Sequence, residues 1–174
     1  EQGCRIRSVR LLPEHSKALG AAVEAIHSAD MIVLAPGSLY TSIIPNLLVD
    51  GIADAIRDSK ALKLYVCNVM TQEGETEGYT VSDHIQALFS HSYPGLFRLC
   101  LTNSTPIPEV IALRYAQEGA EPIRHDVEKC RALGVELIDR PVAALENGLV
   151  RHNPGHLAHE LMTIYEEYKP KDPA

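Results

Sequence analysis

The chain has 174 residues, of which 45% are hydrophobic and 22% charged. This length and usage are typical of one globular domain with a substantial core. The net charge is −7 at pH 7 and no basic block stands out, which argues against nucleic acid as a partner. No apolar run approaches the roughly 18 to 20 residues of a membrane-spanning helix, and no signal-peptide pattern opens the chain, so we expect a cytoplasmic protein without a membrane partner.

The four cysteines, Cys4, Cys67, Cys100 and Cys130, form no Cys-x-x-Cys pair. Their spacing therefore supports neither a zinc site nor a redox motif. Cys67 and Cys100 each end an apolar run, where a free cysteine behaves as a small hydrophobe. We expect free thiols and a reducing compartment.

The first third of the chain predicts two strands separated by a helix. Residues 5–12 alternate charged or polar residues with apolar ones, which is typical of a half-exposed strand. Residues 16–28 place apolar residues near helical spacing and predict a helix with one buried face. The apolar run Met31–Leu34 predicts a buried strand, which Pro36 and Gly37 end.

Strands and helices alternate through the rest of the chain. Apolar runs predict strands over residues 62–67, 96–101 and 135–138, with a short edge strand at 122–124. Helices are expected from residue 52, over 80–90, from 106 to about 117, over 126–133 and from 154 or 155 onward, with a loop around residues 141–148. This order predicts a single three-layer α/β domain over residues 1–168 with a mainly parallel sheet, followed by a frayed tail at 169–174.

The stretch Ala-Pro-Gly-Ser-Leu-Tyr-Thr-Ser-Ile-Ile-Pro-Asn, residues 35–46, carries the first candidate site. A strand that breaks into a glycine turn and continues as a helix exposes several backbone N–H groups at one point. These donors and the helix dipole attract anions together, so we expect the turn to hold a phosphate. The alternative is an ordinary turn in which Gly37 only permits a positive φ.

Polar loops follow three of the predicted strands, at residues 36–42, 68–72 and 102–105. Ligands of open parallel sheets lie outside the carboxyl ends of the strands. If these strands are neighbours, the loops share one rim that offers amides, hydroxyls and backbone N–H groups with few charges. Such a rim suits a phosphorylated, hydroxyl-rich or base-bearing ligand.

Several polar side chains near this rim fit either a ligand or a structural role. Asn46 either contacts a ligand or ends a turn, and Tyr79 and Tyr115 either stack on a base or pack in the core. Arg151 is the cation best suited to a phosphate, with a surface charge as the alternative. Asp83 opens a predicted helix, and no spacing of acidic residues is diagnostic of a metal site.

Residues 29–49, residues 65–79 and Asp83-His84 closely resemble the bacterial gluconeogenesis factor family, whose relatives include 2-phospho-L-lactate transferase. Residues 114–122 and 150–154 fit the same family, and the likeness covers about residues 5 to 165. The resemblance implies a Rossmann-like fold with a ligand cleft. One branch is regulatory, binds nucleotide sugars such as UDP-N-acetylglucosamine and affects carbon use and cell shape. The other branch transfers phospholactate from a nucleotide-activated donor and uses Mg²⁺.

The two branches differ just after Pro36-Gly37. Transferases tend to carry Asn-Pro there, whereas this chain has Ser38-Leu39-Tyr40. The resemblance therefore favours a regulatory nucleotide-sugar binder, with no catalytic residue predicted and with Mg²⁺ expected only for the transferase. The predicted ligand set is Gly37, Ser38, Tyr40, Thr41, Asn46, Asn68, Thr71, Gln72, Tyr79, Asp83, Tyr115 and Arg151.

Members of this family begin with a strand and a glycine-rich turn that contributes to the ligand site. No such strand–turn–helix element precedes Glu1. We therefore expect the chain to represent the C-terminal half to two-thirds of a longer protein, with the first strand absent or supplied by another chain. A third hypothesis follows, in which the chain binds no ligand alone and serves contacts in a homo-oligomer.

Overall fold

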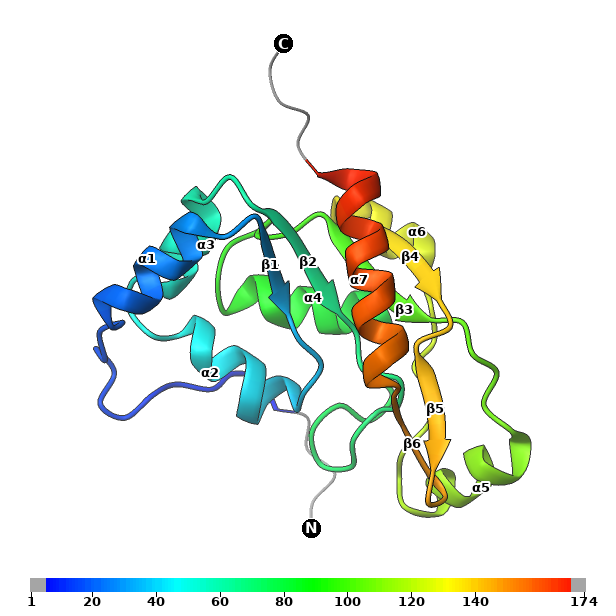
Figure 1. Cartoon of the computed structure of the whole chain (residues 1–174). Coiled ribbons are helices and arrows are strands. Elements are labelled where there is room, and N and C mark those ends of the chain that lie inside the picture. The colour runs from blue at the N-terminus through cyan, green and yellow to red at the C-terminus, as the bar shows by residue number, and fades with distance from the viewer. Residues whose placement is uncertain (1–5, 170–174) are drawn as a thin grey trace.

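The computed structural model describes residues 6–169, and their main feature is a sheet of four parallel strands (Figure 1). The strands lie in the order β1 (Met31–Leu34), β2 (Leu62–Val66), β3 (Leu99–Asn103) and β4 (Glu136–Arg140). A separate antiparallel hairpin pairs β5 (Ala143–Glu146) with β6 (Leu149–His152). The helical segments are α1 (Gly20–Ser28), the π-helical turn η1 (Leu39–Ile43), α2 (Ile44–Leu47), α3 (Ile52–Asp58), α4 (Val81–Ser90), α5 (Glu109–Gln117), α6 (Val127–Ala132) and α7 (Pro154–Tyr168).

Helices cover both faces of the sheet, so the predicted three-layer α/β fold is confirmed. Alternation along β2 directs Leu64 and Val66 to one face and Tyr65 to the other. The first face packs against α7 through Ile164, while the second packs against α4 and its neighbours (Figure 1). Strands buried on both sides carry nearly continuous apolar runs, which is why three of the four were recognisable near their observed bounds.

The start of α4 follows the sequence closely. Its N-cap is Thr80, and the structure has a full capping box in which the Thr80 N–H donates to Asp83 Oδ2 at 2.8 Å. In a capping box two orphan backbone donors gain side-chain partners, which fixes where the helix begins.

Two predicted elements near the N-terminus differ from the structure. Residues 6–12 form no strand; the Val9 N–H donates to a side chain, His91 Nε2, at 3.2 Å. The first helix starts at Gly20 rather than residue 16, since Lys17 forms a β-bridge with Asp50. Residues 1–5 and 170–174, with most of the predicted tail, lie outside the described residues.

Three later predictions are also corrected. Residues 96–98 form no strand, and β3 starts at Leu99. Residues 122–124 make only isolated bridges, from Pro122 to Met70 and from Arg124 to Thr80. The loop predicted around 141–148 contains β5 and the turn of the β5–β6 hairpin, which has positive φ at Asn147 and Gly148 (50° and 77°). Asn-Gly is the preferred pair for such a turn, so the sequence contained this signal.

Cys67, Cys100 and Cys130 are free and buried, as predicted, while Cys4 lies outside the described residues. Across residues 6–169, every helix is too short or too polar to pass through a membrane.

Candidate functional site

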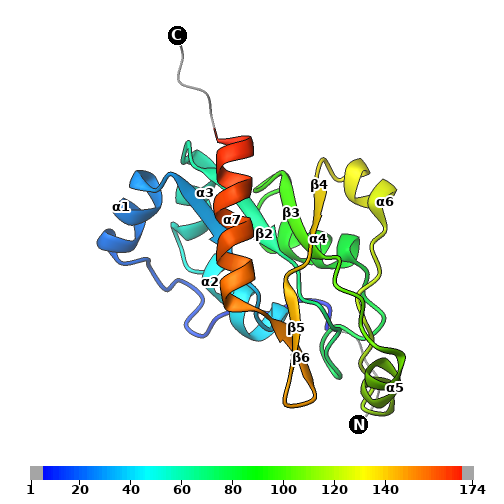
Figure 2. The same ribbon diagram turned by 45° about the vertical axis from the view of Figure 1, so that its right-hand side comes forward.

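The carboxyl ends of β1, β2 and β3 meet at one edge of the sheet, as the predicted shared rim requires. The three strands are parallel neighbours, and α5 and the β5–β6 hairpin lie beyond the same end of the molecule (Figures 1 and 2). The loops after β1 and β2 are joined directly. The Gly37 N–H donates to Asn68 Oδ1 at 3.2 Å, and Asn68 Nδ2 donates to the Gly37 carbonyl at 2.8 Å. Ser38 Oγ also donates to Gln72 Oε1 at 2.9 Å.

The backbone N–H groups at the start of the helical segment after Gly37 are hydrogen-bonded to a carboxylate of the protein itself. The N–H groups of Tyr40 and Thr41 donate to Glu75 Oε1 at 3.0 and 3.1 Å. Glu75 is only 7% exposed, and its Oε2 has no hydrogen-bond partner among the described residues. The phosphate expected at Tyr40 and Thr41 is therefore replaced by this carboxylate. The pattern of residues 35–46 predicted that an anionic group binds at this turn, but not that this group is the side chain of Glu75.

Tyr40 and Tyr79 lie in the core rather than on the rim. Their hydroxyl oxygens are 2.9 Å apart and their rings meet edge to face. Burial, together with the hydrogen bond to Tyr79, raises the pKa of Tyr40 well above its ordinary value of 10.0. Tyr79 also packs edge to face against His84, which is fully buried. We therefore assign both tyrosines to packing, the alternative that the sequence had left open for Tyr79.

Three further predicted ligand residues have structural contacts. Thr71 is buried and exchanges two hydrogen bonds of 2.8 Å with the Glu121 backbone, from its N–H and to its hydroxyl oxygen. Asp83 completes the capping box of α4. Asn46 donates to the Ser42 carbonyl within the helical segment and lines a hollow between β1 and α2, away from the loop after β2. These contacts explain their residue types without a ligand.

A hollow lies between the two joined loops and β6. Its volume is about 310 Å³, and it brings together Gly37, Asn68 and Arg151 from the predicted set. Arg151 forms no ion pair with any residue in the described range 6–169. The hollow is lined by Pro36, Gly37, Asn68, Val69, Met70, Val150, Arg151 and His152.

Tyr115 fixes the strand that carries Arg151. Its hydroxyl oxygen accepts a hydrogen bond from the Val150 N–H at 2.9 Å, so α5 is attached to β6 one residue before Arg151. Figure 2 shows α5 close to the tip of the hairpin. Tyr115 was predicted to stack on a base and Arg151 to pair with a phosphate. The structure brings these two residues into one region.

His152 is the residue of this hollow that the sequence did not single out. Burial lowers the pKa of its imidazole below the ordinary 6.5, partly offset by the Cys67 carbonyl, and its buried Nε2 has no hydrogen-bond partner among the described residues. The imidazole is therefore neutral at pH 7, and Arg151 supplies the positive charge. Between residues 6 and 169, no group of three or more His, Cys, Asp or Glu side chains is arranged to hold a metal ion.

The buried imidazoles of His84 and His152 predict a stability that depends on pH. Burial lowers both pKa values below 6.5, so the unfolded chain binds these protons at higher pH than the folded chain. Their contribution is complete above pH 6.5 and is lost as the pH falls through the folded pKa values. We expect urea unfolding to give a lower free energy at about pH 5.5 than at about pH 7.5, and a smaller difference for His152→Asn. An equal difference in that variant would contradict the assignment.

Comparisons with known proteins add to this geometry. Residues 1–143 match the family described as 2-phospho-L-lactate transferase CofD. The chain belongs to this family. It is 45% identical over 160 residues to the gluconeogenesis factor of Halalkalibacterium halodurans and 41% identical over 167 residues to that of Bacillus subtilis. The resemblance to gluconeogenesis factors is confirmed by these names.

The chain spans about half the length of the curated relatives it matches: 92% and 96% of this chain align with 50% and 53% of those two proteins. A crystal structure of a Bacillus halodurans protein superposes with a TM-score of 0.88 at 45% identity, covering 92% of this chain and 51% of that one. A second crystal structure, titled as a member of the UPF0052 family, gives the same TM-score and identity.

Proposed function

We propose that this CofD-family chain forms part of a regulatory protein of carbon metabolism and cell shape that binds a nucleotide sugar of the UDP-N-acetylglucosamine type. The observation that carries the proposal is Arg151, a guanidinium without an ion-pair partner in the described residues, beside Gly37 and Asn68 in one hollow. A planar guanidinium binds a diphosphate through two parallel hydrogen bonds. The two relatives are named gluconeogenesis factors, and this name supports a role in carbon metabolism.

The neighbours of Arg151 suit the other parts of such a ligand. Tyr115 is an aromatic residue close to Arg151 in space, since its hydroxyl is bonded to the Val150 N–H, and base–aromatic stacking tolerates many bases. His152 is neutral and therefore adds no second charge. Arg151 is the one lysine or arginine that lines this hollow, and in a chain of net charge −7 a lone cation favours one compact anionic group over a polyanion.

The second candidate is phospholactate transfer in deazaflavin coenzyme biosynthesis, with the same loops holding the donor. The family description supports it, while Ser38-Leu39-Tyr40 after Gly37 is the sequence feature that favours the regulatory branch. The third candidate, a chain without ligand binding of its own, follows from the half-length match.

Calorimetric titration of the protein containing this chain separates the candidates. We expect UDP-N-acetylglucosamine to bind, and Arg151→Ala to weaken it by about 10- to 100-fold, the loss of one charge-assisted pair of hydrogen bonds. Arg151→Lys should lie between the two, because an ammonium group binds as a point charge.

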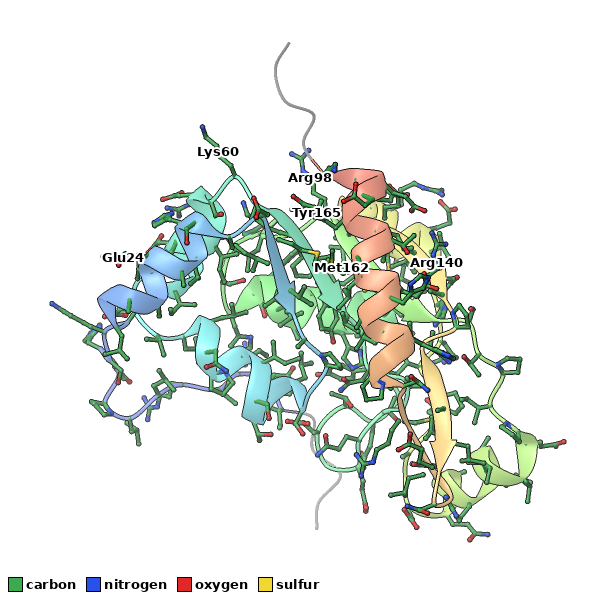
Figure 3. All side chains as sticks on the ribbon, in the orientation of Figure 1. Glu24, Lys60, Arg98, Arg140, Met162 and Tyr165 are labelled. Atoms are coloured by element: carbon green, nitrogen blue, oxygen red, sulfur yellow. The ribbon has the colours of Figure 1, made fainter. Side chains whose placement is uncertain are left out.

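Arg98→Ala is the matched control. Arg98 is exposed and lies just before the amino end of β3, near the last turns of α7 and away from the rim (Figure 3). Equal affinities of wild type and Arg151→Ala would overturn the role of Arg151. Binding of the deazaflavin precursor without UDP-N-acetylglucosamine would support the transferase, and binding of neither would leave the third candidate.

A further inference from the structure

A second hollow adjoins the Arg151 hollow at the same edge of the sheet. Its volume is about 330 Å³, and it shares Asn68 and Val69 with the first. The two hollows therefore lie on either side of the residues that follow β2. The second is lined by Asn68, Val69, Asn103, Thr105, Ile107, Pro122, Ile123 and His125.

His125 is oriented in this hollow by Asp139, at the carboxyl-terminal part of β4. His125 Nδ1 lies 3.0 Å from Asp139 Oδ1, and the Thr102 hydroxyl donates to the same carboxylate oxygen. A carboxylate facing Nδ1 fixes the tautomer that carries its proton there. In the neutral imidazole, Nε2 is then a hydrogen-bond acceptor. It has no partner among the described residues, and the side chain is 27% exposed.

The other polar side chains of the hollow are held by the backbone. Asn103 Oδ1 accepts from the N–H groups of Thr105 and Ala143 at 3.1 and 3.0 Å, and Asn103 Nδ2 donates to the Thr105 carbonyl at 2.9 Å. One amide proton of Asn103 is left to donate. The hollow thus presents a preorganised acceptor and a donor, the pair that a hydroxyl group matches.

The charges around His125 disfavour an anion in this hollow. Asp139 stands directly behind the imidazole, and the carboxylate repels a second negative group at short range. No lysine or arginine lines the hollow to offset that repulsion. The two adjoining hollows therefore differ in chemistry, one suited to an anion and the other to a neutral polyol.

We propose that the His125 hollow is the subsite for the neutral, hydroxyl-bearing part of the ligand, with a ligand hydroxyl donating to His125 Nε2. This inference rests on the proposed function, because the anionic part held at Arg151 places the sugar next to it. Asp139 acts as a positioning residue through the imidazole. Neither residue was singled out from the sequence, since 14 residues separate them and only the return of the chain along β4 brings them together.

Calorimetry with UDP and UDP-N-acetylglucosamine tests the subsite. We expect wild type to bind the sugar nucleotide more tightly than UDP. His125→Phe keeps an aromatic ring without the acceptor, and we expect it to lose about 10-fold in affinity for UDP-N-acetylglucosamine with UDP unchanged. Asp139→Asn should lose a smaller factor in the same direction. His159→Phe, at an exposed position of α7, should change neither affinity.

Equal losses for both nucleotides, or no loss for either, would overturn the subsite while leaving the proposed function standing. If neither nucleotide binds wild type, the proposed function fails, and NMR titration with N-acetylglucosamine alone decides the subsite. If N-acetylglucosamine shifts the ring resonance of His125 but not that of His159, the subsite is supported. If the His125 resonance does not move, the subsite is overturned.

Discussion

Glu75→Ala is expected to lower the free energy of unfolding by about 2 to 4 kcal/mol, because two backbone donors lose a shared charged acceptor in a buried place. Those donors are the N–H groups of Tyr40 and Thr41, both within 3.1 Å of Glu75 Oε1. Each unsatisfied buried donor keeps its full desolvation penalty. Chemical denaturation of both proteins at neutral pH measures the difference.

Two variants sharpen this prediction. Glu75→Gln retains one carbonyl acceptor, so we expect about half of the loss. Glu77→Ala, in the same loop, removes an exposed acceptor of the Gly74 N–H and should cost less than about 1 kcal/mol, since water replaces an exposed partner. If Glu75→Ala is as stable as wild type, the N–H groups of Tyr40 and Thr41 are hydrogen-bonded to water in the variant, and the prediction is wrong.

Inorganic phosphate gives an independent test of the same position. If Glu75 occupies the anion position of this turn, added phosphate should stabilise Glu75→Ala more than it stabilises wild type, by mass action at the vacated donors. Equal stabilisation of the two proteins would show that the turn has no anion position to fill. The sequence-based interpretation of residues 35–46 as an anion-binding turn would then be wrong.

Much of the sheet was predictable from the sequence because β1, β2 and β3 carry apolar runs and the central two lie mostly buried. Met31–Leu34 is apolar throughout, and Leu62–Val66 carries a single charge at Lys63. Such runs identify a parallel sheet without knowledge of the partners. The parallel pairing then brings the loops after β1 and β2 together, which is why Gly37 and Asn68 were predicted to share a rim.

The sequence-based assignments that were wrong concern segments whose contact partners cannot be identified from the sequence. Residues 6–12 alternate as a strand does, but alternation gives no neighbour to pair with, and Val9 bonds to a side chain. Tyr79 and Thr71 are polar enough for a ligand site, yet their contacts come from segments tens of residues away. Long-range pairs of this kind depend on the folded topology. The hairpin at Asn147-Gly148 is different, because its turn signal is local.

A hydrogen-bond network that the sequence did not reveal joins the starts of α4 and α6 through Asp126. Its carboxylate accepts hydrogen bonds from the Thr80 hydroxyl at 2.7 Å, from the Ser82 N–H at 2.9 Å and from the Ser82 hydroxyl. The side chain is 18% exposed. These bonds fix the segment after residue 119 against α4, and that segment carries His125. Asp126 therefore supports the edge of the second hollow without lining it.

We expect Asp126→Ala to lower the free energy of unfolding at pH 7 by about 2 to 4 kcal/mol, because three donors lose a charged acceptor. Asp126→Asn keeps an acceptor oxygen but loses the charge, so its loss should be smaller. Glu128→Ala, which removes an exposed ion pair with Arg131, is the control on the same segment and should cost no more than about 0.5 kcal/mol. Urea unfolding of the four proteins measures these differences.

The pH dependence distinguishes this network from simple packing. Burial raises the pKa of Asp126, but the hydrogen bonds from Ser82 and Thr80 outweigh it, and the net pKa lies below the ordinary 3.8. A depressed carboxyl pKa stabilises the fold fully above pH 3.8, and this contribution is lost as the pH falls through the folded pKa. The advantage of wild type over Asp126→Ala should therefore shrink on acidification. An advantage that stays constant between pH 7 and about pH 3 would assign the effect to lost packing, since packing of a side chain does not depend on its charge.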